Sequence, residues 1–80
     1  MFYTYILKSK LTGSYYIGQT NDIVKRLHLH NSGYNKSTKN GLPWELVYSE
    51  KYNTRSEAVR RENYIKGKKS KAYIENLINS

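Results

Sequence analysis

The chain has 80 residues, with nine tyrosines, no cysteine, and 14 Lys and Arg against six Asp and Glu. The absence of cysteine excludes a disulfide scaffold and a thiolate zinc site. No apolar run approaches the roughly 18 residues of a membrane-spanning helix, and the N-terminus lacks a signal-peptide pattern, so we expect one cytoplasmic domain over residues 1–80. The net charge of +8 favours a polyanionic partner, either nucleic acid or an anionic membrane surface. We prefer nucleic acid, and the alternative is a basic surface that is only solvated.

Two aromatic segments near the N-terminus, residues 2–8 and 14–18, predict a β-hairpin because turn residues separate them. If Tyr5 lies opposite Tyr16, Lys8 faces Gly13 across a four-residue loop, which is a common hairpin length. Directly opposed residues share a sheet face. We therefore expect both phenols and the Lys8 ammonium on one face, which is the candidate active surface.

A helix is expected from the polar segment 19–22, whose side chains can cap free amides, to about residue 31. Ile23 and Leu27 form its buried stripe. Arg26 and His30 are one turn apart at the edge of that stripe. A cation and an imidazole in this position are expected to reach over the sheet.

The next segment, residues 32–43, is polar, rich in turn residues and long for a connection in a compact domain. Two interpretations stay open: a loop that contacts a nucleic-acid backbone through Lys36 and Lys39, or a mobile spacer. Residues 44–52 then alternate well enough for a third strand. The residues expected on one side of that strand are Trp44, Leu46, Tyr48 and Tyr52.

Two further helices are predicted near the C-terminus. Thr54 and Glu57 fit a capping box, so one helix begins there and ends at Gly67, a favourable C′ residue. The other covers about residues 70–79. Its packing face is expected to consist of Tyr73, Ile74, Leu77 and Ile78.

Glu62 interrupts the inward stripe of the first of these helices, between Ala58 and Ile65. An unpaired buried charge is expensive, so Glu62 needs a partner. One interpretation is a structural ion pair with Arg26, Arg55 or Arg61, and the other is a metal ligand. Six of the 14 cations fall between residues 60 and 71. From this cluster, the residues expected to contact nucleic acid are Arg60, Lys66, Lys68, Lys69 and Lys71.

An ordered set of motifs resembles the GIY-YIG nuclease family over nearly the whole chain. The matching segments are Tyr3-Thr4-Tyr5, Tyr16-Ile17-Gly18, Lys25-Arg26-Leu27 with His30, Leu42-Pro43-Trp44-Glu45-Leu46-Val47-Tyr48, and Arg61-Glu62-Asn63-Tyr64-Ile65-Lys66. The chain is most similar to small stand-alone members that are labelled as similar to the nuclease domain of the bacterial excision-repair endonuclease.

The resemblance implies an α+β fold, in which helices flank a small three-stranded antiparallel sheet, and cleavage of DNA phosphodiesters with Mg²⁺ or Mn²⁺ in repair or processing. Tyr5 and Tyr16 match the two motif tyrosines, and Arg26 matches the family arginine. His30 lies where relatives have His or Tyr. Glu62 matches the metal-binding glutamate of the family. Lys8 matches a lysine that some repair relatives use in catalysis.

The sequence departs from the family pattern at three places. Tyr3 replaces the glycine of the first motif, as in other small members. Gln19 replaces a second lysine of the repair relatives, and no equivalent of a late asparagine is evident, although Asn76 and Asn79 are available.

The expected chemistry follows from these roles. Glu62 is a hard oxygen ligand that suits Mg²⁺, and the guanidinium of Arg26 can hold phosphate oxygens. Tyr16, assisted by Tyr5, is the best candidate to accept the proton of water, with His30 as the alternative. A free phenol has a pKa near 10, so nearby cations such as Lys8 and Arg26 are needed to lower it.

The rival interpretation is a non-catalytic module that binds nucleic acid. A kinase or nucleotide hydrolase is disfavoured because no glycine-rich phosphate loop is present. The expected partner is DNA, or RNA, and no membrane. Since no separate targeting domain is expected, specificity is either low or supplied by a partner protein.

Overall fold

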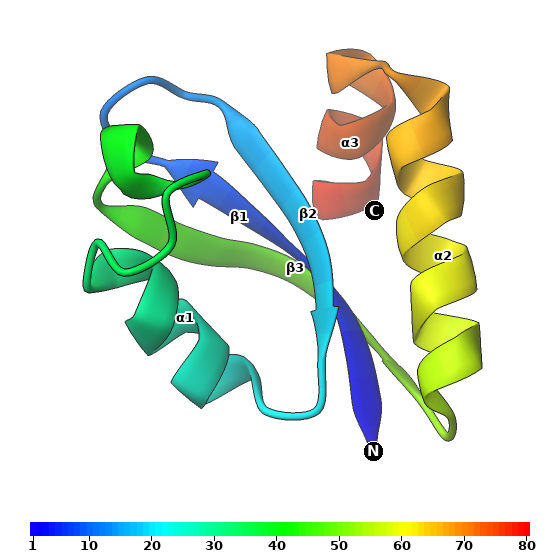
Figure 1. Ribbon diagram of the computed structural model, residues 1–80. Helices are drawn as coiled ribbons and strands as arrows, with labels where there is room; N and C mark the ends of the chain where they lie inside the picture. The colour runs from blue at the N-terminus through cyan, green and yellow to red at the C-terminus, as the bar shows by residue number, and fades with distance from the viewer.

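A computed structural model describes residues 1–80 as a three-stranded antiparallel sheet with three α-helices (Figure 1). This arrangement confirms the predicted α+β class. None of the helices has the length and apolar character needed to cross a membrane. The elements in chain order are β1 (Phe2–Ser9), β2 (Tyr15–Thr20), α1 (Ile23–Asn31), the 3₁₀ turn η1 (Lys39–Gly41), β3 (Trp44–Tyr52), α2 (Arg55–Lys68) and α3 (Lys71–Ile78).

The hairpin forms as predicted, but its register differs by two residues. Tyr5 lies opposite Gly18, and Leu7 lies opposite Tyr16. The predicted pairing of Tyr5 with Tyr16 is therefore wrong. A slip of two residues leaves every side chain on its original face because side chains alternate with a period of two. Tyr5 and Tyr16 consequently still share one face. The slip also allows β2 to continue past Gly18 to Thr20.

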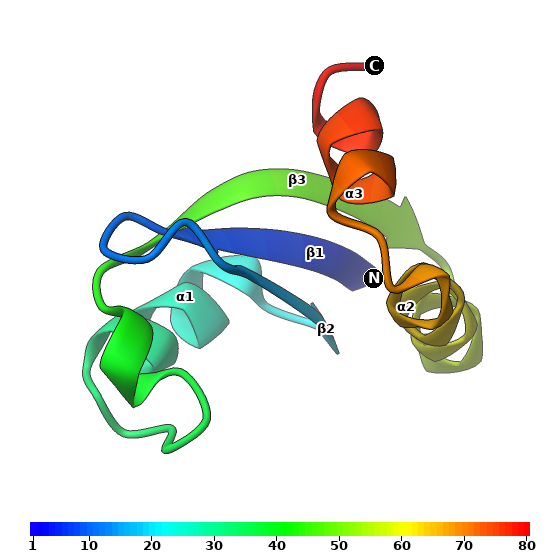
Figure 2. The same cartoon turned by 90° about the horizontal axis from the view of Figure 1, so that it is seen from above.

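The sheet, in the order β2-β1-β3, has a separate apolar cluster on each face. Figure 2 shows α1 on one side of the sheet and α3 on the other, with α2 beside β2. On the α1 side, Tyr5, Leu7 and Trp44 pack with residues of α1. On the other side, Ile6 and Ile17 pack with residues of α2 and α3, and the predicted packing face of α3 is confirmed.

A β-bulge in the pairing of β1 with β3 moves part of β3 to the other face. Leu7 pairs with Leu46, but the next pair is Ile6 with Tyr48, so Val47 is the extra residue. Trp44 therefore packs on the α1 side, while Tyr48 packs on the side of α2 and α3. The prediction that Trp44, Leu46, Tyr48 and Tyr52 share a side is wrong, because one inserted residue breaks the alternation.

Helices α1 and α2 begin at predicted capping residues, whereas Ser70, expected as the first residue of the last helix, lies just before α3. The side chain of Asp22 accepts from Lys25 N, Thr54 and Glu57 form the capping box, and Ser70 caps α3. The end of α2 differs from the prediction. Gly67 is still helical, and Lys69 adopts the left-handed conformation at the helix end, with φ 48° and ψ 39°.

Candidate active site

The site is built over Gly18, where the phenol of Tyr5 lies directly against the backbone of β2. A Cβ atom at Gly18 would be 2.6 Å from the Tyr5 hydroxyl and 2.7 Å from Cζ. No side chain other than hydrogen fits at that separation. The glycine of the second motif therefore has a packing role: it allows the Tyr5 ring to cross the neighbouring strand.

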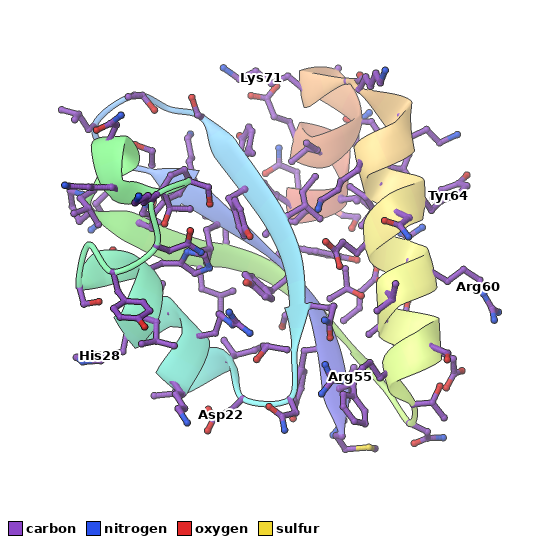
Figure 3. The ribbon with its side chains drawn as sticks, in the orientation of Figure 1. Asp22, His28, Arg55, Arg60, Tyr64 and Lys71 are labelled. Atoms are coloured by element: carbon purple, nitrogen blue, oxygen red, sulfur yellow. The ribbon has the colours of Figure 1, made fainter.

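A buried chain of hydrogen bonds begins at the same phenol. The Tyr5 hydroxyl is 3.1 Å from His30 Nε2, and His30 Nδ1 is 3.0 Å from Thr38 Oγ1. The Thr38 hydroxyl donates to Asn35 O, which leaves its lone pairs free for a proton on His30 Nδ1. This assignment makes His30 Nε2 the acceptor and Tyr5 the donor. His30 is only 1% exposed, and His28, two residues earlier, projects outward from α1 (Figure 3).

The environment keeps both members of this pair neutral. Burial, and secondarily the neighbouring Tyr16, raises the pKa of the Tyr5 phenol far above its ordinary value; the positive charge of Arg26 opposes this shift and the negative charge of Glu62 adds to it. Burial, and then the charge of Arg26, lowers the pKa of His30. Tyr5 is therefore a hydrogen-bond donor, and it lies within the electrostatic reach of both Arg26 and Glu62.

Tyr16 is the more accessible of the two tyrosines. Its half-buried ring lies 4.7 Å from the His30 ring and 6.4 Å from the rings of Tyr5 and Trp44, measured between centroids. The Tyr16 ring therefore packs among three other aromatic rings. In contrast to Tyr5, no hydrogen bond holds the Tyr16 hydroxyl to His30, so this phenol is available to an outside group.

The long loop is tied to the site. Trp44 Nε1 donates to Thr38 O, and the Asn31 amide pairs with both the N–H and the C=O of Trp44. The Trp44 ring also crosses Gly41, where a Cβ would come within 2.5 Å of it. These bonds hold Thr38 against His30, so this part of the loop packs against the site.

The sequence matches a known protein family along almost its whole length. A model of the GIY-YIG catalytic domain matches residues 1–77. The chain belongs to the GIY-YIG family. UPF0213 protein YazA of Bacillus subtilis is 42% identical, with 95% of this chain and 80% of YazA covered. UPF0213 protein SSP2268 of Staphylococcus saprophyticus is 49% identical, with 80% and 78% covered.

The fold of this GIY-YIG protein also resembles a solved structure. The solution NMR structure of UPF0213 protein BH0048 from Bacillus halodurans matches with a TM-score of 0.61 and 36% sequence identity, covering 99% of this chain and 84% of that one. Membership indicates a nuclease family whose members act on DNA and generally depend on a divalent metal ion.

The family glutamate, Glu62, does not pair with an arginine. Its carboxylate lies 2.6 Å from Lys66 Nζ, one turn along α2, and its side chain is 16% exposed. Arg61 instead binds Glu50 through two hydrogen bonds of 2.9 and 3.1 Å, and Arg55 lies over the Phe2 ring. The expected ion pair with Arg26, Arg55 or Arg61 is therefore wrong, because two of these arginines are already engaged and Lys66 is the helical neighbour.

Lys8 is on the wrong face for the role expected from the family resemblance. It is three residues from Tyr5, and an odd separation in a strand reverses the side-chain direction. Lys8 lies opposite Tyr15, with Nζ 5.7 Å from the Tyr15 ring centre, in a pocket shared with α3. The prediction that Lys8 joins the two phenols is wrong.

The residues of the GIY-YIG site fit a divalent ion with few protein ligands. No group of three or more His, Cys, Asp or Glu is close enough together to form a protein cage. Glu62 is a single hard oxygen donor, and Mg²⁺ commonly uses one or two carboxylates with water and phosphate. Gln19 Oε1 is buried without a hydrogen-bond partner. Its strand position opposite Thr4, which donates to Ala58 O of α2, places it on the face that α2 covers.

The predicted nucleic-acid contacts lie on several surfaces. Lys36 shares a pocket of about 270 Å³ with Arg26 and His30, and Lys39 is exposed on η1. Arg60 projects from the outer side of α2 (Figure 3), and Lys68 lies over the rings of Tyr64 and Tyr73. The remaining three, Lys66, Lys69 and Lys71, line one pocket.

Sequence reasoning missed Thr38 and the packing roles of Gly18 and Gly41. Thr38 lies in a polar segment, and nothing local distinguishes it from its exposed neighbours. Its position beside His30 depends on the Trp44 contacts, which join residues far apart in the sequence.

Proposed function

We propose that this GIY-YIG protein is a metal-dependent endonuclease that hydrolyses phosphodiester bonds in DNA. One observation carries the proposal: Tyr5, Tyr16 and His30 meet on one sheet face, and the opposite charges of Arg26 and Glu62 both act on Tyr5. These are five of the six residues to which the family resemblance gives a role in the reaction; the sixth, Lys8, lies on the other face.

Tyr16 is the residue that accepts the proton of the attacking water. His30 is buried and uses both ring nitrogens in hydrogen bonds, so it has no free nitrogen for water. Burial raises the pKa of the Tyr5 phenol, so Tyr5 stays protonated at neutral pH as a hydrogen-bond donor and cannot accept a proton from water. His30 and Tyr5 are therefore positioning residues: their rings hold Tyr16, whose hydroxyl is free.

Arg26 and Lys36 bind the phosphate backbone. Both are exposed and line one pocket with His30, and a guanidinium fork can contact two phosphate oxygens at once. Glu62 would hold the metal ion, which when bound stabilises negative charge on the departing oxygen. In that arrangement Lys66 keeps the carboxylate in place from one turn away.

The test is Glu62→Gln, with Glu45→Gln as a matched control. Both glutamates contact a lysine, at 2.6 and 4.0 Å, but Glu45 is an exposed residue paired with Lys10. Plasmid and linear DNA are incubated with each protein and Mn²⁺ or Mg²⁺. We expect cleavage by wild type and Glu45→Gln and none by Glu62→Gln. The free energy of unfolding of Glu62→Gln should fall only slightly, by about 0.5 kcal/mol, which is typical of an i,i+4 pair.

DNA affinity and melting temperature are measured on the same samples. Binding should persist in Glu62→Gln because Lys and Arg make the phosphate contacts. Cleavage at the wild-type rate by folded Glu62→Gln would contradict the metal assignment. A wild-type protein that binds DNA without cutting it under any metal condition would favour the binding-module alternative.

A further inference from the structure

A second concave site lies outside the tyrosine site. It has a volume of about 430 Å³ and lies where the β1–β2 turn and β2 approach the junction of α2 and α3. Lysines form its rim, namely Lys66, Lys69 and Lys71. Its floor is apolar and consists of Ile17, Ile65 and Ile74. Figure 3 shows Lys71 at the start of α3, where the chain turns back from α2.

The charge of this pocket is not neutralised by the protein. The structure contains three salt bridges, and of the rim lysines only Lys66 takes part in one. Lys69 and Lys71 are exposed and have no carboxylate partner, and no Asp or Glu lines the pocket. Two ammonium groups beside a concave apolar surface favour a ligand that carries both an anion and an apolar part.

The backbone at Lys69 gives an independent indication. Lys69 is the only residue other than glycine with positive φ, at a helix end where glycine is usually preferred. A lysine here has a steric cost that glycine would avoid. Such strain is often found where a side chain has a function, and the residue that adopts it here lines the pocket.

We propose that this pocket is a nucleotide subsite, in which Lys69 and Lys71 bind a phosphate group while the sugar and base rest on the isoleucine floor beside Tyr15. The volume is within the range of ligand pockets, about 300–1,000 Å³. The half-buried Tyr15 ring adds an aromatic surface on which a base can stack.

The position of Lys66 links this subsite to the proposed reaction. Lys66 lines the pocket and also binds Glu62, one helical turn or about 5 Å away along α2. We therefore assign the subsite to a nucleotide of the strand that is cut, next to the bond at Glu62. This assignment rests on the proposed function, whereas the pocket's affinity for a nucleotide does not.

The first experiment measures binding alone, without metal. Thymidine 5′-monophosphate, thymidine and inorganic phosphate are titrated separately into protein with labelled isoleucine methyl groups. We expect the monophosphate to shift the signals of Ile17, Ile65 and Ile74 at lower concentration than thymidine or phosphate. In the double variant Lys69→Asn/Lys71→Gln its affinity should fall about tenfold or more, because each charged hydrogen bond is strong. Asn is used because it tolerates the left-handed conformation.

Lys51→Gln together with Lys25→Gln is the matched control, since it removes the same charge at exposed positions outside the pocket. A monophosphate that leaves the three isoleucine signals unchanged would overturn the proposal. So would equal weakening by the control and by the pocket variant, because the effect would then be one of net charge.

The second experiment distinguishes a strand nucleotide from a free nucleotide. Affinity for a labelled oligonucleotide is measured for each variant, with and without the monophosphate as competitor. A weaker affinity of the pocket variant and competition by the monophosphate support the strand assignment. If the pocket variant binds DNA as tightly as wild type does, while wild type still binds the monophosphate, the strand assignment is overturned and the pocket is one for a free nucleotide. Monophosphate binding by a protein that never cleaves DNA would refute the proposed nuclease while the pocket assignment stands.

Discussion

Replacing Gly18 by alanine should disrupt the site without touching any charged residue. The new Cβ would lie 2.6–2.7 Å from the end of the Tyr5 ring, whereas carbon atoms in contact are normally about 3.5–4.0 Å apart. The ring must therefore withdraw by about 1 Å. Since the Tyr5 hydroxyl is 3.1 Å from His30 Nε2, a displacement of this size disturbs the geometry of that hydrogen bond.

The magnitude follows from these two effects. Overpacking costs about 1–3 kcal/mol, and the disturbed buried hydrogen bond costs up to about 1 kcal/mol. The reduced freedom of the unfolded chain offsets about 0.4–1 kcal/mol. We expect a net loss of roughly 2–3 kcal/mol in the free energy of unfolding. For a domain of this size the melting temperature should fall by about 10–20 °C.

Urea unfolding followed by tryptophan fluorescence measures this loss, since Trp44 packs on the same face. Gly67→Ala is the matched control: no atom lies within 4 Å of its new Cβ, and Gly67 is inside α2. That variant should gain about 0.5–1 kcal/mol. In a Tyr5→Leu background the cost of Gly18→Ala should largely disappear. An equal cost in both backgrounds, or a loss below about 0.5 kcal/mol, would refute the proposed contact.

Two further predictions concern polar clusters. Burial alone would raise the pKa of the Glu50 carboxyl, but hydrogen bonds from Arg61, Tyr48 and Tyr52 outweigh burial and lower this pKa below the ordinary 4.5. The resulting stabilisation is present above pH 4.5 and is lost as the pH falls through the pKa of the folded state. The urea midpoint should therefore decline on acidification, and it should decline less steeply in Glu50→Gln. Thr38→Val should cost about 1–3 kcal/mol, because it leaves His30 Nδ1 buried without a partner; an unchanged urea midpoint would contradict the hydrogen-bond chain.

The order and type of the elements could be predicted because their signals are local. Asp22, Thr54 and Ser70 satisfy amides within three residues of themselves, so a helix start is visible in the sequence. The strands at residues 2–8 and 44–52 could be predicted because their aromatic and β-branched residues are also a local signal. The family motifs further predicted a set of site residues, of which Tyr5, Tyr16 and His30 meet on one sheet face.

The register and the strand faces needed the tertiary structure. Both registers of the hairpin put Tyr5 and Tyr16 on one face, so alternation could not choose between them; the fit of the Tyr5 ring over Gly18 does. The extra residue at Val47 depends on pairing with β1 and has no signature of its own in β3.

The sequence by itself determined the element types, the basic character and the family, because these depend on residue identity and on contacts between near neighbours. Only the tertiary structure decided that Thr38 supports His30 and that Arg61 is engaged by Glu50, which leaves Glu62 with its helical neighbour Lys66. It also separated the clustered lysines into different surfaces. These outcomes depend on packing between distant segments, where a shift of one residue or one helical turn changes every partner.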